Sequence, residues 1–157
     1  MEQGSEGVDS APTPIQSDRC KEPGLRILVV DNDYGIRFIL SKVLSLAGYK
    51  VVSAKDGLEG LETFSKTPFD LVLTDFRMPG MDGWQLGIRI KKLYPDTPIV
   101  MITGEVQDDI IGKVERSCVD FVMSKPFNIE DVIRVVENIL SSRSHSNVLS
   151  SECRQYL

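Results

Sequence analysis

Short apolar segments recur along the middle of the chain, separated by stretches with a helical pattern. Most are nearly continuous in large apolar residues, which is typical of strands buried on both faces. Strands of this kind that alternate with helices predict an α/β fold built from repeated strand–helix units. The first and fourth segments are the most continuous and are predicted to be interior strands. The five segments are Leu25 to Val30, Lys50 to Ala54, Phe69 to Thr74, Pro98 to Thr103 and Val119 to Ser124.

Apolar residues spaced three and four apart predict five helices, near residues 36–44, 58–64, 84–93, 108–116 and 129–140. Gly48 is expected to end the first, because glycine commonly terminates helices. Asp56 and Glu59 resemble a capping box for the second, and Asn128 can cap the last. The expected core positions are Ile36, Ile39, Leu40, Val43 and Leu44, then Leu58, Leu61 and Phe64, and finally Val132, Ile133, Val136, Ile139 and Leu140.

The two ends of the chain differ from this patterned middle. Residues 1–24 are rich in Gly, Ser, Pro, Gln and acidic residues, and residues 141–157 are again largely polar. Neither end has enough apolar surface to offset the entropy lost on ordering. We therefore expect a flexible leader over 1–24, a single domain over 25–140 and a flexible C-terminal tail over 141–157.

Overall composition narrows the function classes. The net charge of −5 disfavours a nucleic-acid surface, because phosphate binding depends on clustered basic residues. Met1 is not followed by a basic and apolar signal segment, and no apolar run is long enough to cross a membrane. A cytoplasmic protein without membrane contact is therefore expected. Cys20, Cys118 and Cys153 form neither a disulfide framework nor a metal-ligand spacing.

Reactive side chains follow the predicted strands. The carboxyl ends of parallel strands open on one edge of the sheet, so we expect these side chains to meet there. Carboxylate and amide oxygens suit Mg²⁺, and a lysine with a threonine suits an anion. Such a combination is what phosphoryl transfer requires, and an aspartate can itself accept the group as an acyl phosphate. The residues are Asp31, Asn32 and Asp33 after the first strand, Asp75 after the third, Thr103 at the end of the fourth and Lys125 after the fifth.

Four motifs at these strand ends resemble the receiver domain of bacterial two-component response regulators. The resemblance covers about residues 25–140 and implies a flavodoxin-like, doubly wound sheet of five parallel strands in the order 2-1-3-4-5, with five helices. Each motif is weak alone, but four in the right order on the right strand ends are specific. The motifs are Leu28 to Asp33, Leu73 to Asp75 with Met78 to Gly83, Ile102 to Gly104 and Ser124 to Phe127.

The resemblance assigns the acceptor and the metal ligands. Asp75 matches the phosphoacceptor, which takes its phosphoryl group from a sensor histidine kinase or a phosphotransfer protein. Asp31 and Asn32 match the acidic pair that holds Mg²⁺, or Mn²⁺ in its place. Asp75 itself and the backbone carbonyl of Arg77 would complete the protein's share of the metal shell.

The resemblance also assigns the groups around the phosphoryl oxygens. Thr103 and Lys125 match the hydroxyl and the ammonium that bind these oxygens, and Gly104 lies beside them. Arg77 and Glu105 match positions that tune dephosphorylation, although two solvated surface charges are an equally good reading. The peptide bond after Lys125 resembles one that is cis in the family.

Some positions depart from the family pattern or have an ordinary structural interpretation. Asn32 replaces a second acidic residue, which leaves the metal affinity in doubt, and Asp33 is expected to be a helix cap. Val122 stands where the family often has a switching aromatic, and the neighbouring Phe121 is expected in the core. Trp84 is expected to contribute to packing.

The leading functional hypothesis is a single-domain response regulator that signals through a changed protein-binding surface. That surface is expected on residues 108–116, the strand at 119–124 and the last helix. It would be no enzyme beyond its own phosphorylation and dephosphorylation. The sole histidine, His145, lies in the polar tail, which excludes a phosphohistidine donor in an ordered core site.

Three alternatives have different outputs or chemistry. The first is the receiver portion of a larger hybrid kinase or transcription factor, which the start at Met1 and the polar ends disfavour. The second is a metal-dependent phosphatase with an aspartate nucleophile, disfavoured because Arg77 occupies the usual place of its acid–base aspartate. The third is a flavin-binding protein, disfavoured because the acidic segment at 31–33 would repel a phosphate.

Overall fold

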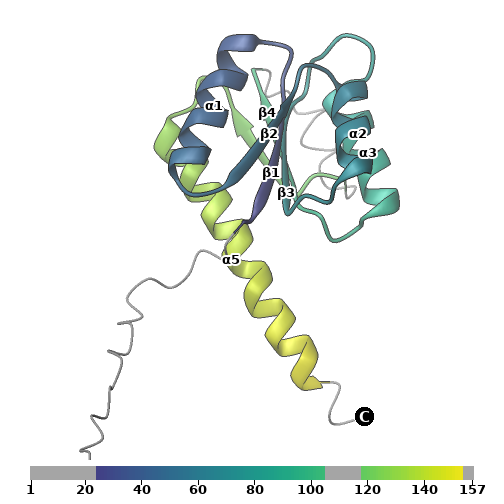
Figure 1. Cartoon of the computed structure of the whole chain (residues 1–157), viewed down its shortest axis with the longest axis vertical. Coiled ribbons are helices and arrows are strands. Elements are labelled where there is room, and N and C mark those ends of the chain that lie inside the picture. Colours follow the sequence, from purple (N-terminus) through teal and green to yellow (C-terminus); the bar gives the residue numbers. More distant parts are fainter. Residues whose placement is uncertain (1–23, 105–117, 154–157) are drawn as a thin grey trace, which may run out of the picture.

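Five parallel strands form the centre of the domain (Figure 1). The computed structural model of the chain describes residues 24–104 and 118–153. The order β2-β1-β3-β4-β5 confirms the predicted fold and the interior positions of the first and fourth strands. The helix predicted at 108–116 and residues 1–23 of the predicted leader lie outside the described residues. The strands are β1 (Arg26–Val30), β2 (Lys50–Ala54), β3 (Leu71–Asp75), β4 (Ile99–Thr103) and β5 (Phe121–Ser124), and the helices are α1 (Tyr34–Leu46), α2 (Gly57–Lys66), α3 (Gly83–Leu93) and α5 (Ile129–Cys153).

Helices cover both faces of the sheet and create two separate cores. Helices α1 and α5 lie on one face, and α2 and α3 lie on the other (Figure 1). Successive residues of β1 point to opposite sides, so Ile27 and Val29 face α1 and α5, whereas Leu28 and Val30 face α2 and α3. Because both faces are apolar and covered, polar functional groups of the central strands are confined to the edges where the strands begin and end.

An aspartate caps each of the first three helices. The carboxylates of Asp33, Asp56 and Asp82 accept hydrogen bonds from the backbone N–H three residues later, at 3.1, 2.8 and 2.8 Å. Such a cap satisfies an N–H that has no partner inside the helix and stabilises it by about 1 kcal/mol. The cap predicted at Asp33 is confirmed. In the predicted capping box, Glu59 bonds back to the N–H of Lys55 at 3.0 Å rather than to that of Asp56.

Three positions predicted for the core are exposed, so those predictions were wrong. Leu58 is 66% exposed, and Ile39 and Phe121 are each 43% exposed. Helix α2 approaches the sheet through Gly60, where a Cβ would lie 3.0 Å from Val30, so its buried face is narrow and omits Leu58. Phe121 begins an edge strand, and Ile39 lies on the flank of α1. The predicted helix positions that are buried are Leu40, Leu44, Phe64, Val132, Val136 and Leu140.

Helix α5 extends past the boundary predicted at Leu140 and ends at Cys153, so residues 141–153 of the predicted tail are helical, and the flexibility predicted for 141–157 stays a prediction. Once a helix has begun, each further residue adds one hydrogen bond, so polar residues can continue it without an apolar face. The Ser142 hydroxyl donates to a carbonyl of its own helix, and the Arg143 guanidinium donates to the Asp70 carbonyl at 2.9 Å. Neither this long helix nor any other in the described ranges is apolar enough to cross a membrane.

Candidate functional site

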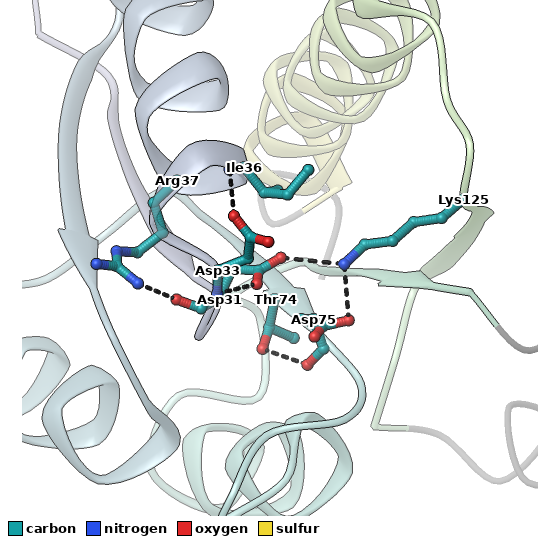
Figure 2. Close-up of polar contacts among 7 residues, drawn as sticks. All are labelled: Asp31, Asp33, Ile36, Arg37, Thr74, Asp75 and Lys125. Atoms are coloured by element: carbon teal, nitrogen blue, oxygen red, sulfur yellow. Dashed lines mark hydrogen bonds and ion pairs between the residues drawn. The ribbon is translucent and has the colours of Figure 1, made fainter.

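The carboxyl edge of the sheet gathers the side chains that the sequence singled out. Asp31 follows β1, Asp75 ends β3, Thr103 ends β4 and Lys125 follows β5. Figure 2 shows the Lys125 side chain extending across this edge toward the two carboxylates. Its Nζ lies 3.2 Å from Asp31 Oδ2 and 3.3 Å from Asp75 Oδ1. The structure therefore brings three of the strand ends into direct contact.

Asp31 is held firmly in place. It is 2% exposed, and its backbone N–H donates to the Ala54 carbonyl at 3.2 Å, which extends the pairing of β1 with β2. Its carboxylate accepts the Asp33 N–H on Oδ1 at 2.8 Å and faces Lys125 with Oδ2 (Figure 2). Both carboxylate oxygens of this buried residue thus have a donor.

Asp75 sits where β3 meets the start of α3. It is 8% exposed, and the Thr74 hydroxyl donates to its carbonyl at 2.9 Å. The N–H of Gly83 donates to the Phe76 carbonyl at 2.9 Å, which brings α3 against the end of the strand. A Cβ at Gly83 would overlap the Asp75 carbonyl oxygen, so only glycine fits this approach.

The charges at this edge do not balance. Burial raises the pKa of the Asp75 carboxyl, and the nearby Asp31 carboxylate raises it further, which together outweigh the opposing effect of Lys125. Burial alone would lower the pKa of Lys125, but the two carboxylates raise it above its ordinary value. Lys125 therefore stays protonated, and its single ammonium forms ion pairs with both Asp31 and Asp75.

Thr103 and Gly104 lie beside this charged group. Thr103 is 1% exposed, and its carbonyl accepts the Lys125 N–H at 2.7 Å, which ties the ends of β4 and β5 together. Gly104 is exposed, and a Cβ there would meet no atom of the described residues within 4 Å. Glu105 lies outside the described residues.

Arg77 lies on the loop between β3 and α3 and is exposed. This loop, which follows the acceptor candidate Asp75 in the sequence, forms a groove of about 450 Å³. The groove is lined by Phe76, Arg77, Met78, Pro79 and Asp82. The sequence predicted Arg77 at the functional site, and in the structure Arg77 lines this groove.

The oxygen donors at this edge fit a magnesium ion. Within the ranges that the structure describes, no three His, Cys, Asp or Glu side chains gather around a common point. The acidic contribution is therefore the pair Asp31 and Asp75, which Lys125 neutralises only in part. The exposed Asn32 amide and the Arg77 carbonyl are the neutral oxygens of the predicted set, and oxygen ligands of this kind suit Mg²⁺.

An apolar groove of about 540 Å³ adjoins the site on the α1 side. It is lined by Ile36, Ile39, Lys125, Pro126, Phe127 and Ile129. The rings of Tyr34 and Phe38, which are 72% and 57% exposed, stack 6.2 Å apart on the same helix. The Lys125–Pro126 bond in this groove is cis, as the family resemblance implied. A larger groove of about 640 Å³ lies between α2 and α3, and neither Asp31 nor Asp75 lines it.

The positions that depart from the family pattern have distinct surroundings. Asn32 is exposed on the loop after β1, and Val122 is half-buried on β5. Phe121 is exposed, which leaves no core role for it. Trp84 packs against the core shared by α2 and α3, as expected.

Two residues at this edge were missed by sequence reasoning. The Arg37 guanidinium donates to the Asp31 carbonyl at 2.6 Å (Figure 2). Gly83 allows the contact between α3 and Asp75. The available signals were weak: Gly83 closes a motif already noted, and Arg37 is a basic residue one turn into the helix that follows Asp31.

Comparisons with known proteins agree with these features. A family model of the response regulator receiver domain matches residues 27–137. The chain is 32% identical over 120 residues to sporulation initiation phosphotransferase F of Bacillus subtilis, covering 76% of this chain and 97% of that protein. It is 37% identical over 117 residues to the DNA-binding transcriptional regulator NtrC of Escherichia coli, covering 73% of this chain but 24% of that protein.

A solved structure shows the same architecture. Response regulator protein TrrA of Thermotoga maritima, crystallised in complex with Mg(2+)-BeF, superposes with a TM-score of 0.66 and 31% identity. The match covers 73% of this chain and 97% of the other. The chain is thus similar both to proteins of receiver length and to one part of a longer regulator.

Proposed function

The chain belongs to the response regulator receiver domain family, and from this premise we propose that Asp75 accepts a phosphoryl group from a sensor histidine kinase or a phosphotransfer protein. Receiver domains are regulatory, so the phosphorylated form is a signal rather than a product. The single observation that carries the proposal is the Asp75 carboxylate at the end of β3, in contact with the Lys125 ammonium and beside Asp31.

The reaction uses groups whose contacts support these roles. An Asp75 oxygen attacks the phosphorus of a phosphorylated imidazole, an O–P bond forms, and the P–N bond to the imidazole breaks. The product is an acyl phosphate. Lys125 then pairs with a phosphoryl oxygen, and the Thr103 hydroxyl donates to another. Because Lys125 keeps its proton, it remains a cation throughout the transfer.

The metal site would be formed by Asp31, Asp75, Asn32 and the Arg77 carbonyl. When bound there, Mg²⁺ supplies positive charge opposite the phosphoryl oxygens. The solved complex of the related TrrA with Mg(2+)-BeF supports this choice of ion. The carboxylates of Asp31 and Asp75 together with the ammonium of Lys125 leave an excess of negative charge at this edge, which favours a bound cation.

The phosphodonor needs a docking surface close to Asp75. We assign it to the apolar groove between α1 and the segment that follows Lys125, because this groove includes Lys125, which contacts Asp75, and carries the exposed side chains of Ile39 and Ile129. The output surface is proposed on residues 108–116, β5 and α5.

The same chemistry could serve a longer regulator. The chain matches about a quarter of the DNA-binding transcriptional regulator NtrC, so a relative of this domain forms one part of a longer protein. In that setting Asp75 would still be the acceptor, and only the output would differ. A phosphatase is less well supported, since Arg77 stands two residues after Asp75 and offers no acidic catalyst.

The test is labelling with radioactive acetyl phosphate in the presence of Mg²⁺. Wild-type protein is expected to incorporate label, and Asp75→Asn to incorporate none. Asp56→Asn is the matched control, because it removes a carboxylate from the same sheet edge while an asparagine still caps α2. Label on Asp75→Asn equal to that on wild type would refute the assignment of the acceptor.

A further inference from the structure

Arg37 reaches out of α1 to the backbone of the loop that carries Asp31 and Asn32. Its Nη1 donates to the Asp31 carbonyl at 2.6 Å, and Figure 2 shows the guanidinium turned toward that oxygen. Its own backbone N–H donates to the Asp33 carbonyl at 3.1 Å, so Arg37 is fixed within the first turns of the helix. The Arg37 side chain is therefore hydrogen-bonded to the loop after β1, while its backbone belongs to helix α1.

The Asp31 carbonyl depends on this donor. The regular pairing of β1 with β2 runs from Arg26 to Val30, and the Asp31 N–H adds one more bond to Ala54. The chain then leaves the sheet, while Asp31 is still 2% exposed. A buried carbonyl without a partner is costly, and Arg37 supplies a charged donor at this point.

Tyr34 restricts the position of the guanidinium. The Arg37 Cζ lies 5.7 Å from the centre of the Tyr34 ring, one helical turn earlier. Contact with an aromatic ring favours the cation modestly at exposed sites. The guanidinium is thus held between an aromatic ring and a backbone carbonyl, and few other orientations keep both contacts.

We propose that Arg37 is a positioning residue: by fixing the backbone between β1 and α1, it orients the Asp31 carboxylate and the Asn32 amide for the ion of the phosphoryl-transfer site. This inference rests on the proposed function, because it concerns ligands of the same site. Arg37 touches neither the Asp75 carboxylate nor Lys125 through any contact in the described ranges. Its effect passes through Asp31.

The experiment compares Mg²⁺ binding in wild type, Arg37→Gln and Arg37→Lys by calorimetry, without a phosphodonor. A hydrogen bond from a charged donor contributes enough that its loss raises the dissociation constant of Mg²⁺ about tenfold in Arg37→Gln. Arg37→Lys keeps a charged donor and recovers part of the affinity. Tyr34→Ala removes the ring contact but leaves the hydrogen bond from Arg37 to the Asp31 carbonyl, and raises the constant about twofold.

A second readout follows the loop directly. In metal-free protein, the backbone amide resonances of Asn32 and Asp33 are expected to shift in Arg37→Gln. Labelling by acetyl phosphate should need more Mg²⁺ for half-saturation, whereas its maximal rate at saturating Mg²⁺ should remain within about twofold of wild type. A merely structural role would not separate these two quantities. Lys42→Gln is the matched control, since it removes a positive charge from an exposed position on the same helix.

The outcomes separate the inference from the proposed function. If wild type is labelled and Arg37→Gln binds Mg²⁺ as wild type and Lys42→Gln do, the positioning role is overturned and the acceptor assignment stands. If Mg²⁺ binding weakens in Arg37→Gln but wild type is not labelled, the positioning role is supported and the proposed function fails. Should Arg37→Gln not fold, wild-type affinity in both Arg37→Lys and Tyr34→Ala overturns the inference.

Discussion

The two edges of the sheet use aspartate in opposite ways. At the amino edge, Asp70 directly precedes β3 and accepts the Arg26 N–H of the neighbouring β1 at 2.7 Å. Asp120 directly precedes β5 and accepts the Ile99 N–H of β4 at 2.7 Å, and Lys91 pairs with the same carboxylate at 2.8 Å. Each of these carboxylates accepts a hydrogen bond from the first N–H of an adjacent strand. Its role is therefore to stabilise the sheet.

At the carboxyl edge, two carboxylates compete for one cation. Asp31 and Asp75 share Lys125, and the pKa of Asp75 is raised by burial and by the charge of Asp31. The residue type is the same at both edges, and the difference lies in the charges, because two buried carboxylates at the carboxyl edge face the one ammonium of Lys125. The proposed phosphoryl-transfer site therefore lies where the described residues leave negative charge only partly compensated.

The largest expected effect distinguishes the two lysines that pair with aspartates. Lys125→Gln should slow labelling of Asp75 by acetyl phosphate about a hundredfold, because the cation facing the phosphoryl oxygens is lost. Lys91→Gln should leave labelling within about twofold and lower the free energy of unfolding by about 0.5 kcal/mol. Labelling rates and urea unfolding measure both. Equal losses of labelling in the two variants would remove the distinction between the edges.

Adding a carboxylate to the carboxyl edge should sharpen the contrast. Asn32→Asp is expected to tighten Mg²⁺ binding by about 1 to 3 kcal/mol, or roughly ten- to a hundredfold, because a charged oxygen replaces a neutral one beside a divalent ion. The measurement is a Mg²⁺ titration of Trp84 fluorescence, supported by calorimetry at equal ionic strength. Dissociation constants that agree within a factor of about two would show that Asn32 does not bind the ion.

Removing an acid from the amino edge should affect only stability. Asp70→Ala leaves the partly buried Arg26 N–H without its acceptor, at a cost of about 1 to 3 kcal/mol in the free energy of unfolding. Asp70→Asn should cost less, because its amide oxygen can still accept. Chemical denaturation gives the stability, and labelling of Asp75 is expected to stay unchanged. A labelling defect in folded Asp70→Ala would contradict a purely structural role.

The smallest expected effect is a gain in stability on replacing Asp75, whereas replacing Asp70 lowers stability. The folded-state pKa of Asp75 lies above its unfolded value, so the ionised carboxylate at pH 7 opposes folding. Asp75→Asn removes that charge and should raise the free energy of unfolding by about 1 kcal/mol in metal-free protein. The advantage should disappear as the pH falls below the unfolded pKa of roughly 3.9. Urea unfolding at both pH values checks this, and a destabilised variant at pH 7 would count against it.

Much of the fold was accessible from sequence because the strands of a covered parallel sheet are continuous apolar runs. The same topology makes the carboxyl edge predictable, since Asp75 ends a strand and Asp31 and Lys125 each follow one directly. The capping aspartates were partly predictable, because they act on an N–H three residues away. Local chemistry and strand order therefore explain most of the candidate site.

What could not be predicted depends on contacts made in three dimensions. Asp70 and Asp120 act on strands 44 and 21 residues away in the sequence, and no local pattern reveals such pairs. The exposure of Leu58 follows from the close approach of α2 at Gly60. The length of α5 was missed because its later residues lack an apolar face, although helix propagation does not require one.

Helix α5 connects the two edges that function so differently. It begins just after the Lys125 loop, and its Arg143 guanidinium is bonded to the Asp70 carbonyl at the far end of the sheet. From Ile129 to Arg143 the helix spans about 21 Å as a stiff rod. A displacement at the start of α5 that moves the helix as a rigid body also displaces Arg143, so the hydrogen bond from Arg143 to the Asp70 backbone carbonyl opposes that movement.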